Sequence, residues 1–240
     1  LKPAEANYPV ALEIVGPDGQ GYGARATYPG RGNYPTRFWP TGAPFCDTYE
    51  TEVWDSFPAP AVGALRLRLL DKPFGAGLRV TGLDGQPQGD DVRWPIIVRA
   101  TQPPPAPAVA TDYRFGDQIR LAGYTLTPLP DGRGLRVGLT WEAGVQPTED
   151  YKVFVHLRDT PQTAFTQSDQ RPRGGAYPTN AWAAGERVLD EHLLTWPAGV
   201  KPPPLTLYLG LYRAADGARA PIVDGQGQAL PNNELILPLP

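Results

Sequence analysis

The sequence predicts an all-β protein built from two tandem immunoglobulin-like β-sandwich domains. Three observations lead to this prediction. One motif of aromatic and turn-forming residues occurs twice, short runs alternate between apolar and polar side chains, and 30 prolines with 27 glycines among 240 residues leave little room for long helices. We place the first domain at 1–100, a proline-rich linker at 101–110 and the second domain at 111–240.

The repeated motif indicates a domain duplication. Its residue types recur without a gap, each 143 positions further along the chain: Gly32, Tyr34, Pro35, Thr36, Trp39, Gly42 and Asp47, then Gly175, Tyr177, Pro178, Thr179, Trp182, Gly185 and Asp190. We interpret it as a structural loop in which tryptophan closes one end of a sandwich core, glycine permits a tight bend and aspartate accepts backbone N–H groups. The alternative is a ligand rim, with the stacking rings Tyr34, Trp39, Tyr177 and Trp182 against sugars.

The first domain is predicted to be a series of short strands. Val10, Leu12 and Ile14 recur at every second position, which is the period of a strand, and a turn at 17–19 leads to a return strand over 22–28. After the motif, further strands are expected over 45–54, 65–69, 78–83 and 94–98.

The second domain opens with two strands, over 115–126 and 135–141, for which the first has no counterpart. The two domains align again from Tyr151 onward. After the motif the offset falls to 140, which places Leu205, Leu207 and Leu209 on Leu65, Leu67 and Leu69.

The first domain lacks counterparts of these two strands, because the residues that would align with them would precede Leu1. Three explanations stay open: an upstream truncation with local rearrangement, a naturally shortened sheet, and strands donated by a neighbouring chain.

Composition narrows the classes of partner. The formal charge of −3 is small and the basic residues are scattered, which excludes a nucleic-acid footprint. Cys46 is the only cysteine, so no intrachain disulfide and no cysteine-based zinc site is possible, and we expect it to be a small buried residue. Without an 18-residue apolar run or a signal peptide, the chain is expected to be a soluble piece of something longer.

The residues that carry chemistry give little support for catalysis. A metal site would have to draw on His156, Asp169, Asp190 or His192, but no ligand spacing such as HExxH is present, and we expect neither metal nor cofactor. His192 is predicted to be a solvated strand residue. No nucleophile elbow, P-loop or dinucleotide motif occurs, and we expect no catalytic residue in this chain.

Two tyrosines form a further candidate site. Tyr208 and Tyr212 lie opposite the leucines of their strand, so they share one surface of a sheet. Either a packed neighbour or a ligand is expected to cover them.

The second domain resembles a domain at the C-terminal, extracytoplasmic end of bacterial membrane glycosyltransferases of the protein O-mannosyltransferase type and related uncharacterised membrane proteins. The residues that carry this resemblance are 115–124 (FGDQIRLAGY), 150–157 (DYKVFVHL), 167–169 (QSD), 175–179 (GAYPT), Trp182, 185–186 (GE) and 210–213 (GLYR). The first domain departs from it, with Glu13 in place of His156 and Ala26 in place of Asp169. The resemblance implies an outward-facing accessory β-sandwich, with transferase chemistry in a membrane part that this chain does not contain.

These observations favour a non-catalytic extracytoplasmic accessory module, at the cell surface or secreted, that binds a glycan or lipid-linked sugar or positions an acceptor. Its candidate binding residues are Tyr34, Trp39, His156, Asp169, Tyr177, Trp182, Tyr208 and Tyr212. Its other expected partners are the membrane part of the same polypeptide or neighbouring subunits. One alternative is an assembly subunit of a surface filament or layer that exchanges strands between neighbours. Another is a glycan-acting enzyme dependent on His156 or Asp190.

Overall fold

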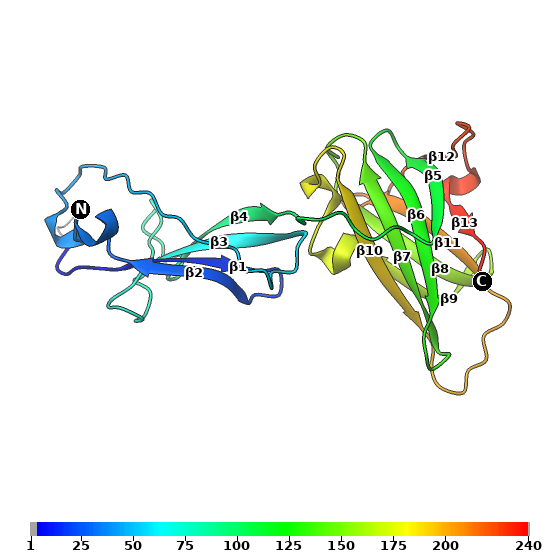
Figure 1. The fold of residues 1–240 in the computed structure, drawn as a ribbon, viewed down its shortest axis with the longest axis horizontal. Helices are drawn as coiled ribbons and strands as arrows, with labels where there is room; N and C mark the ends of the chain where they lie inside the picture. The colour runs from blue at the N-terminus through cyan, green and yellow to red at the C-terminus, as the bar shows by residue number, and fades with distance from the viewer. Residues whose placement is uncertain (1–3, 240) are drawn as a thin grey trace. The chain divides into compact units, whose positions relative to one another are not determined.

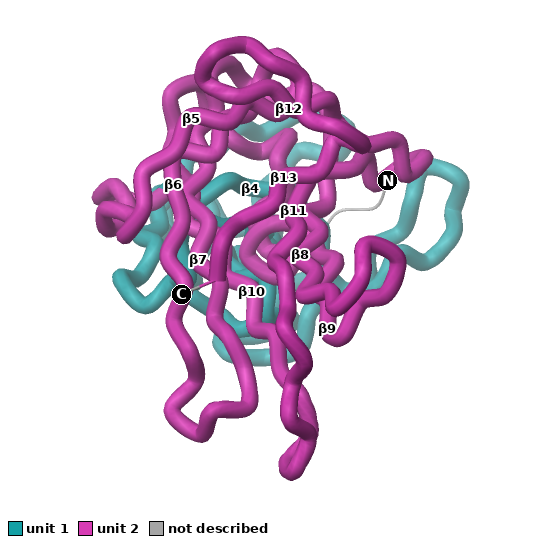
Figure 2. Tube along the Cα trace, turned by 90° about the vertical axis from the view of Figure 1, so that its right-hand side faces the viewer, with its two compact units in different colours: residues 1–99 teal, residues 100–240 magenta. Residues whose placement is uncertain are grey.

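The computed structural model describes residues 4–239, which form a nearly all-β chain with three antiparallel sheets (Figure 1). The chain divides into two compact units, residues 1–99 and residues 100–240 (Figure 2). The architecture is consistent with a β-sandwich, and the helices of the described residues are short 3-10 turns of three or four residues.

Unit 1 has one sheet among its described residues, with four strands in the order β2-β1-β3-β4. Its elements are β1 (Val10–Val15), β2 (Gly21–Thr27), η1 (Gly30–Gly32), η2 (Thr36–Phe38), β3 (Ala61–Leu69) and β4 (Val92–Val98). The predicted alternation is present in β1, where Val10, Leu12 and Ile14 are buried. The predicted turn joins β1 to β2, and Gly19 adopts a φ of 79° there, which side chains disfavour.

Unit 2 has a five-stranded sheet in the order β10-β7-β6-β5-β12 and a four-stranded sheet in the order β13-β11-β8-β9 (Figure 1). Its strands are β5 (Val109–Phe115), β6 (Ile119–Pro128), β7 (Gly134–Ala143), β8 (Tyr151–Thr160), β9 (Thr163–Gln170), β10 (Arg187–Thr195), β11 (Thr206–Arg213), β12 (Ile222–Val223) and β13 (Leu235–Leu237). Its 3-10 helices are η3 (Pro172–Gly175), η4 (Thr179–Ala181) and η5 (Pro231–Asn233). Alternate residues of both sheets are buried, among them Val137, Leu139 and Trp141 of β7 and Val153, Val155 and Leu157 of β8.

The four-stranded sheets of the two units have the same strand order, since β2, β1, β3 and β4 correspond in sequence to β9, β8, β11 and β13. The registers also agree. Ile14 lies opposite Leu65 in unit 1, and Leu157 lies opposite Leu207 in unit 2. The predicted match of Leu65 with Leu205 is therefore wrong by two residues, a slip that keeps the same side chains on the same face.

Several predicted elements differ from the structure. Residues 45–54 and 78–83 form no strand. The first segment makes one backbone bond to β2, from the N–H of Trp54 to Tyr22, and the second makes isolated bonds to Leu69 and to residues 86–89 that do not extend into a ladder. Residues 115–126 contain the end of β5, a turn at Gly116 with a φ of 58°, and most of β6. Cys46 is exposed rather than buried, since no second sheet covers its segment.

Candidate functional site

The outer face of the four-stranded sheet of unit 2 brings together four of the predicted site residues. Register places His156 of β8 opposite Tyr208 of β11 and opposite Gln167 of β9. Asp169 and Tyr212 lie on the same face. Because side chains alternate along a strand, all of these point away from the sandwich core.

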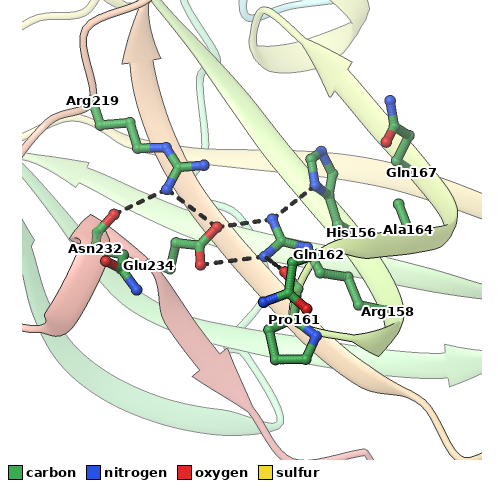
Figure 3. Close-up of a pocket in the computed structure, with 9 residues that line it drawn as sticks. All are labelled: His156, Arg158, Pro161, Gln162, Ala164, Gln167, Arg219, Asn232 and Glu234. Atoms are coloured by element: carbon green, nitrogen blue, oxygen red, sulfur yellow. Dashed lines mark hydrogen bonds and ion pairs between the residues drawn. The ribbon is translucent and has the colours of Figure 1, made fainter.

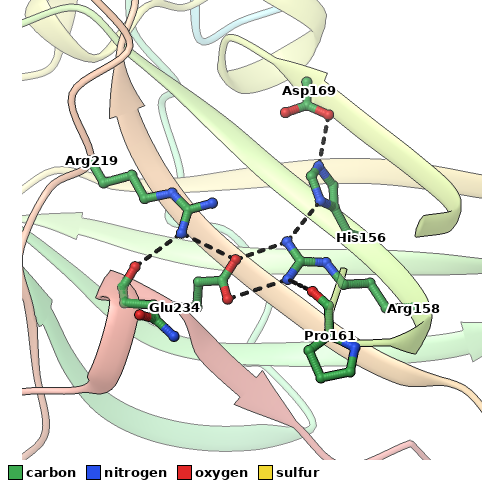
Figure 4. A network of polar contacts seen from close by, with 7 residues as sticks. His156, Arg158, Pro161, Asp169, Arg219 and Glu234 are labelled. Atoms are coloured by element: carbon green, nitrogen blue, oxygen red, sulfur yellow. Dashed lines mark hydrogen bonds and ion pairs between the residues drawn. The ribbon is translucent and has the colours of Figure 1, made fainter. Parts of the chain in front are cut away.

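A polar network joins the strands of this face (Figure 4). Arg158 donates to both carboxylate oxygens of Glu234, at 2.8 and 3.2 Å, and to the backbone oxygen of Pro161 at 3.1 Å. Its Nη2 also lies 3.1 Å from Nδ1 of His156. This arrangement holds the ends of β8 and β13 together, and Arg158 is correspondingly buried.

The network defines the tautomer that fits His156. A guanidinium can only donate, so Nδ1 of His156 accepts from Arg158. The proton then lies on Nε2, which donates to Oδ2 of Asp169 at 2.9 Å. Both ring nitrogens are thus engaged by the protein, in an orientation set by its two neighbours.

Arginine side chains cover much of the aromatic surface. The Arg219 guanidinium lies 5.0 Å from the ring centre of Phe154 and donates to the backbone oxygen of Asn232 at 3.0 Å. The Arg158 guanidinium lies 4.4 Å from the ring centre of Tyr208. Phe154 is 2% exposed and Tyr208 is half-buried, so little of either ring is free to stack on a ligand.

Tyr212 is tied to the same face. Its ring stacks on Phe154 with the centres 6.4 Å apart. Burial, followed by the charge of Asp169 and its hydrogen bond, raises the pKa of the Tyr212 hydroxyl. The hydroxyl is therefore a neutral hydrogen-bonding group at ordinary pH. A glycine, Gly210, lies beneath this cluster, where a Cβ atom would come within 2.5 Å of the Phe154 ring.

Beside the network lies an open hollow of about 570 Å³ (Figure 3). Its lining is mostly polar: His156, Arg158, Pro161, Gln162, Ala164, Gln167, Arg219, Asn232 and Glu234. Three of these residues are amides, and the two arginines are balanced by Glu234 and by Asp169 behind the histidine. The hollow thus offers hydrogen-bond donors and acceptors with little net charge.

The repeated motif has a structural role in both units. Thr36 accepts from the N–H of Tyr8 at 2.9 Å and donates to the backbone oxygen of Ala6 at 2.7 Å. Thr179 makes the matching bonds to Tyr151 and Glu149, at 2.9 and 2.6 Å. These bonds tie the motif loop to the chain just ahead of β1 and β8.

The aromatic residues of the motif do not form a ligand rim. Tyr177 and Trp182 are buried, and the Trp182 indole donates to the backbone oxygen of Tyr177 at 3.1 Å. Trp39 makes the same 3.1 Å bond to Tyr34, and both of these are half-buried. The interpretation of Tyr177 and Trp182 as sugar-stacking rings is wrong, because their faces are packed inside unit 2.

His192 belongs to a buried chain of hydrogen bonds. Its Nε2 lies 2.9 Å from Oδ2 of Asp190, its Nδ1 lies 2.9 Å from Oγ of Ser168, and Asp190 also accepts from the N–H of Arg173 at 2.7 Å. The prediction of a solvated His192 is wrong, since its side chain and that of Asp190 are fully buried. The residue types serine, histidine and aspartate are those of a hydrolase triad, but the ring nitrogens are exchanged, since a triad histidine contacts serine through Nε2 and aspartate through Nδ1. His192 is also buried. These hydrogen bonds connect β9, β10 and η3.

Some residues of the site were missing from the sequence prediction. Arg158 lies two positions after His156 and faces the same way, so strand parity alone would have found it. Glu234 and Arg219 come from distant segments, and Glu234 is 76 positions from Arg158. No local pattern connects them.

Residues 4–239 contain no cluster of three or more His, Cys, Asp or Glu side chains arranged to hold a metal ion. Within the same residues no helix has the length and apolar character needed to cross a membrane. Comparison of the chain with protein-family models, with curated proteins and with solved structures gives no match.

Proposed function

We propose that this chain is a non-catalytic accessory module that binds a neutral saccharide in the polar hollow of unit 2. The observation that carries the proposal is the lining of that hollow. It combines amide side chains with charged groups that already neutralise one another, and its volume of about 570 Å³ is within the usual range of ligand sites.

The polarity of the hollow selects the class of ligand. Sites for drug-like or lipid-like ligands are predominantly apolar, which this lining is not. An anionic ligand would find Arg158 and Arg219 already paired with Glu234. Uncharged hydroxyl groups both donate and accept, and they match amide side chains and paired ions without requiring an ion pair to break.

The proposal includes the wider setting predicted from the sequence. The two units would be tandem immunoglobulin-like domains, with unit 2 the complete sandwich. The module would be extracytoplasmic, attached to a membrane glycosyltransferase, and would hold the glycan, lipid-linked sugar or acceptor on which that enzyme acts. What supports this setting is the all-β architecture together with the resemblance of residues 113–223.

The test is isothermal titration of the whole chain with neutral oligosaccharides containing mannose, glucose or galactose, with lipid-linked sugars and with a uronic acid oligomer. We expect a neutral saccharide to bind at least as tightly as the acidic one. Gln167→Ala, in the hollow, should weaken binding about fivefold to tenfold, the cost of one or two lost hydrogen bonds.

Gln226→Ala is the matched control, because Gln226 is also an exposed amide but lies in a turn outside the hollow. It should leave affinity unchanged. Absence of heat with every saccharide, or equal effects of the two substitutions, would remove the support for this function.

A further inference from the structure

One apolar face of unit 1 is covered over β1 but only partly covered over β3 and β4, whereas its counterpart in unit 2 is covered throughout. On β1 this face consists of Val10, Leu12 and Ile14, which are at most 9% exposed. The leucine face of unit 1 consists of Leu65, Leu67 and Leu69 of β3 and Val92 and Trp94 of β4. Register matches these residues to five leucines of unit 2: Leu207, Leu209, Leu211, Leu235 and Leu237. All five are at most 3% exposed, whereas Leu69 is 37% and Trp94 is 47% exposed.

The cover in unit 2 comes from the five-stranded sheet, which has no counterpart among the described residues of unit 1. Within that part of the chain, the leucine face of unit 1 therefore lacks the layer of strands that packs on its counterpart in unit 2. Unit 2 shows which kind of structure fits over such a face, namely antiparallel strands whose inward residues are large and apolar, such as Val137, Leu139 and Trp141 of β7.

A second feature of unit 1 points to the same missing structure. Residues 44–54 match β10 in sequence, and Asp47 bonds the N–H of Gly30 at 2.7 Å as Asp190 bonds that of Arg173. In unit 2, β10 pairs along its length with β7, from Arg187 opposite Glu142 to Thr195 opposite Gly134. Within residues 4–239, no backbone N–H from 45 to 53 donates to a backbone carbonyl, although that of Thr48 bonds the Asp47 carboxylate. This segment therefore has main-chain N–H groups that another strand could pair.

The edge and the face are positioned for one partner. Residues 50–54 run beside β2, where Arg25 donates to the oxygen of Glu50 and the N–H of Trp54 donates to Tyr22. In unit 2 the strands next to β10 are β7 and then β6. A hairpin in their place beside 44–54 would extend past the buried residues of β1 toward β3 and β4. A strand paired to residues 44–54 therefore covers the leucine face as well.

We propose that residues 44–54 and the leucine face form a docking surface for an amphipathic antiparallel β-hairpin, which takes the place of β6 and β7. The partner's first contact is main-chain pairing with 44–54, and its inward residues alternate as large apolar side chains. A second copy of this chain is a poorer occupant. Two leucine faces packed together would bury Trp94 but would give the N–H groups of 45–53 no main-chain carbonyl to pair with.

The test uses the full chain and a defined probe, the hairpin of residues 117–145 of this sequence fused to a soluble carrier. Hydrogen exchange is followed by mass spectrometry with and without the probe. We expect exchange across 44–54 to slow about tenfold or more, because pairing protects these amides. Peptides from unit 2 should not change.

Two controls separate docking from general adhesion. A probe in which Val137, Leu139 and Trp141 are replaced by serine should give no protection. In the chain, Trp94→Ser should weaken binding about tenfold, as expected for an aromatic anchor. Ile97→Ser should have no effect, since Ile97 is similarly exposed, at 46%, but lies on the opposite face of β4.

Three results would overturn the proposal. One is unchanged exchange at 44–54 with saturating probe, and another is an equal loss of affinity for Trp94→Ser and Ile97→Ser. The third is a dimer, detected by sedimentation, in which 44–54 is protected without any probe, because the occupant would then be a second copy.

Discussion

Units 1 and 2 contain the same loop motif and the same strand order in one sheet, but among the described residues only unit 2 has a second sheet packed on it. The hydrogen bonds of the motif form in both units. Thr36 and Thr179 make matching pairs of hydrogen bonds, and Trp39 and Trp182 each donate to the backbone five residues earlier. These bonds therefore form without a second sheet, between the loop and itself or the segment at the start of β1 or β8.

What differs is burial and strand pairing. Trp182 is 1% exposed, whereas Trp39 is half-buried against the exposed ring of Phe45 at 5.0 Å. The segment that follows each motif is a paired strand in unit 2 and an irregular segment in unit 1. The comparison teaches that the motif specifies a loop, and that a second sheet is needed to turn the loop into the end of a core.

The largest effect that tests this comparison is loss of the motif tryptophan. Trp182→Ala should destabilise unit 2 by about 3–5 kcal/mol, because it leaves a cavity in a packed core. Trp39→Ala should cost unit 1 clearly less, since its ring is half in solvent. Hydrogen exchange measured at increasing denaturant concentrations gives the stability of each unit from the peptides of that unit. Equal costs would mean that the second sheet contributes nothing to the role of the tryptophan.

A smaller effect should be the same in both units. Thr36→Val and Thr179→Val keep the shape of the side chain but remove a hydroxyl that both accepts and donates, and both residues are buried. Each substitution should cost about 1–3 kcal/mol through the unsatisfied backbone groups it leaves. The same exchange measurement compares them. A cost confined to unit 2 would show that the loop bonds depend on the second sheet after all.

The fold could be predicted from sequence where the signal is local. Alternation located β1, and the repeated motif forms the same hydrogen-bonded loop in both units. A strand was also predicted over 45–54, but a strand requires a ladder, and in the described part of unit 1 this segment makes a single backbone bond to β2, from Trp54 to Tyr22. The offset was wrong by two residues after the motif because a slip of two leaves every side chain on its face.

The residues of the candidate site could be predicted only where alternation along a single strand places them on one face. Strand parity placed Tyr208 and Tyr212 on one surface, and the His156 to Asp169 contact joins neighbouring strands. Glu234 and Arg219 reach the same place through the register of β13 and a loop, which a single sequence does not determine. Burial of His192 was missed because a polar residue at an alternate position of β10 has the same pattern whether it faces solvent or a buried aspartate.

The smallest expected effect concerns the residue that follows each motif aspartate by two positions, Tyr49 in unit 1 and His192 in unit 2. The Tyr49 hydroxyl, and then the N–H of Gly30, lower the pKa of Asp47 below its ordinary value of 3.8. A pKa lowered by folding means that the ionised carboxylate stabilises unit 1. This contribution is complete above the ordinary value and is lost as the pH falls through the lower, folded one.

Unit 1 should therefore lose stability on acidification from about pH 5 to about pH 2, and Tyr49→Phe should make that loss shallower. The difference between the two proteins is the informative quantity, because Asp18 and Asp91 of unit 1 also have lowered pKa values and are common to both. This difference is measured from the denaturant midpoints of hydrogen exchange in unit 1 peptides of both proteins at a series of pH values. Parallel pH curves would mean that Tyr49 does not hold Asp47 as His192 holds Asp190, and the similarity of the two units would then end at the loop.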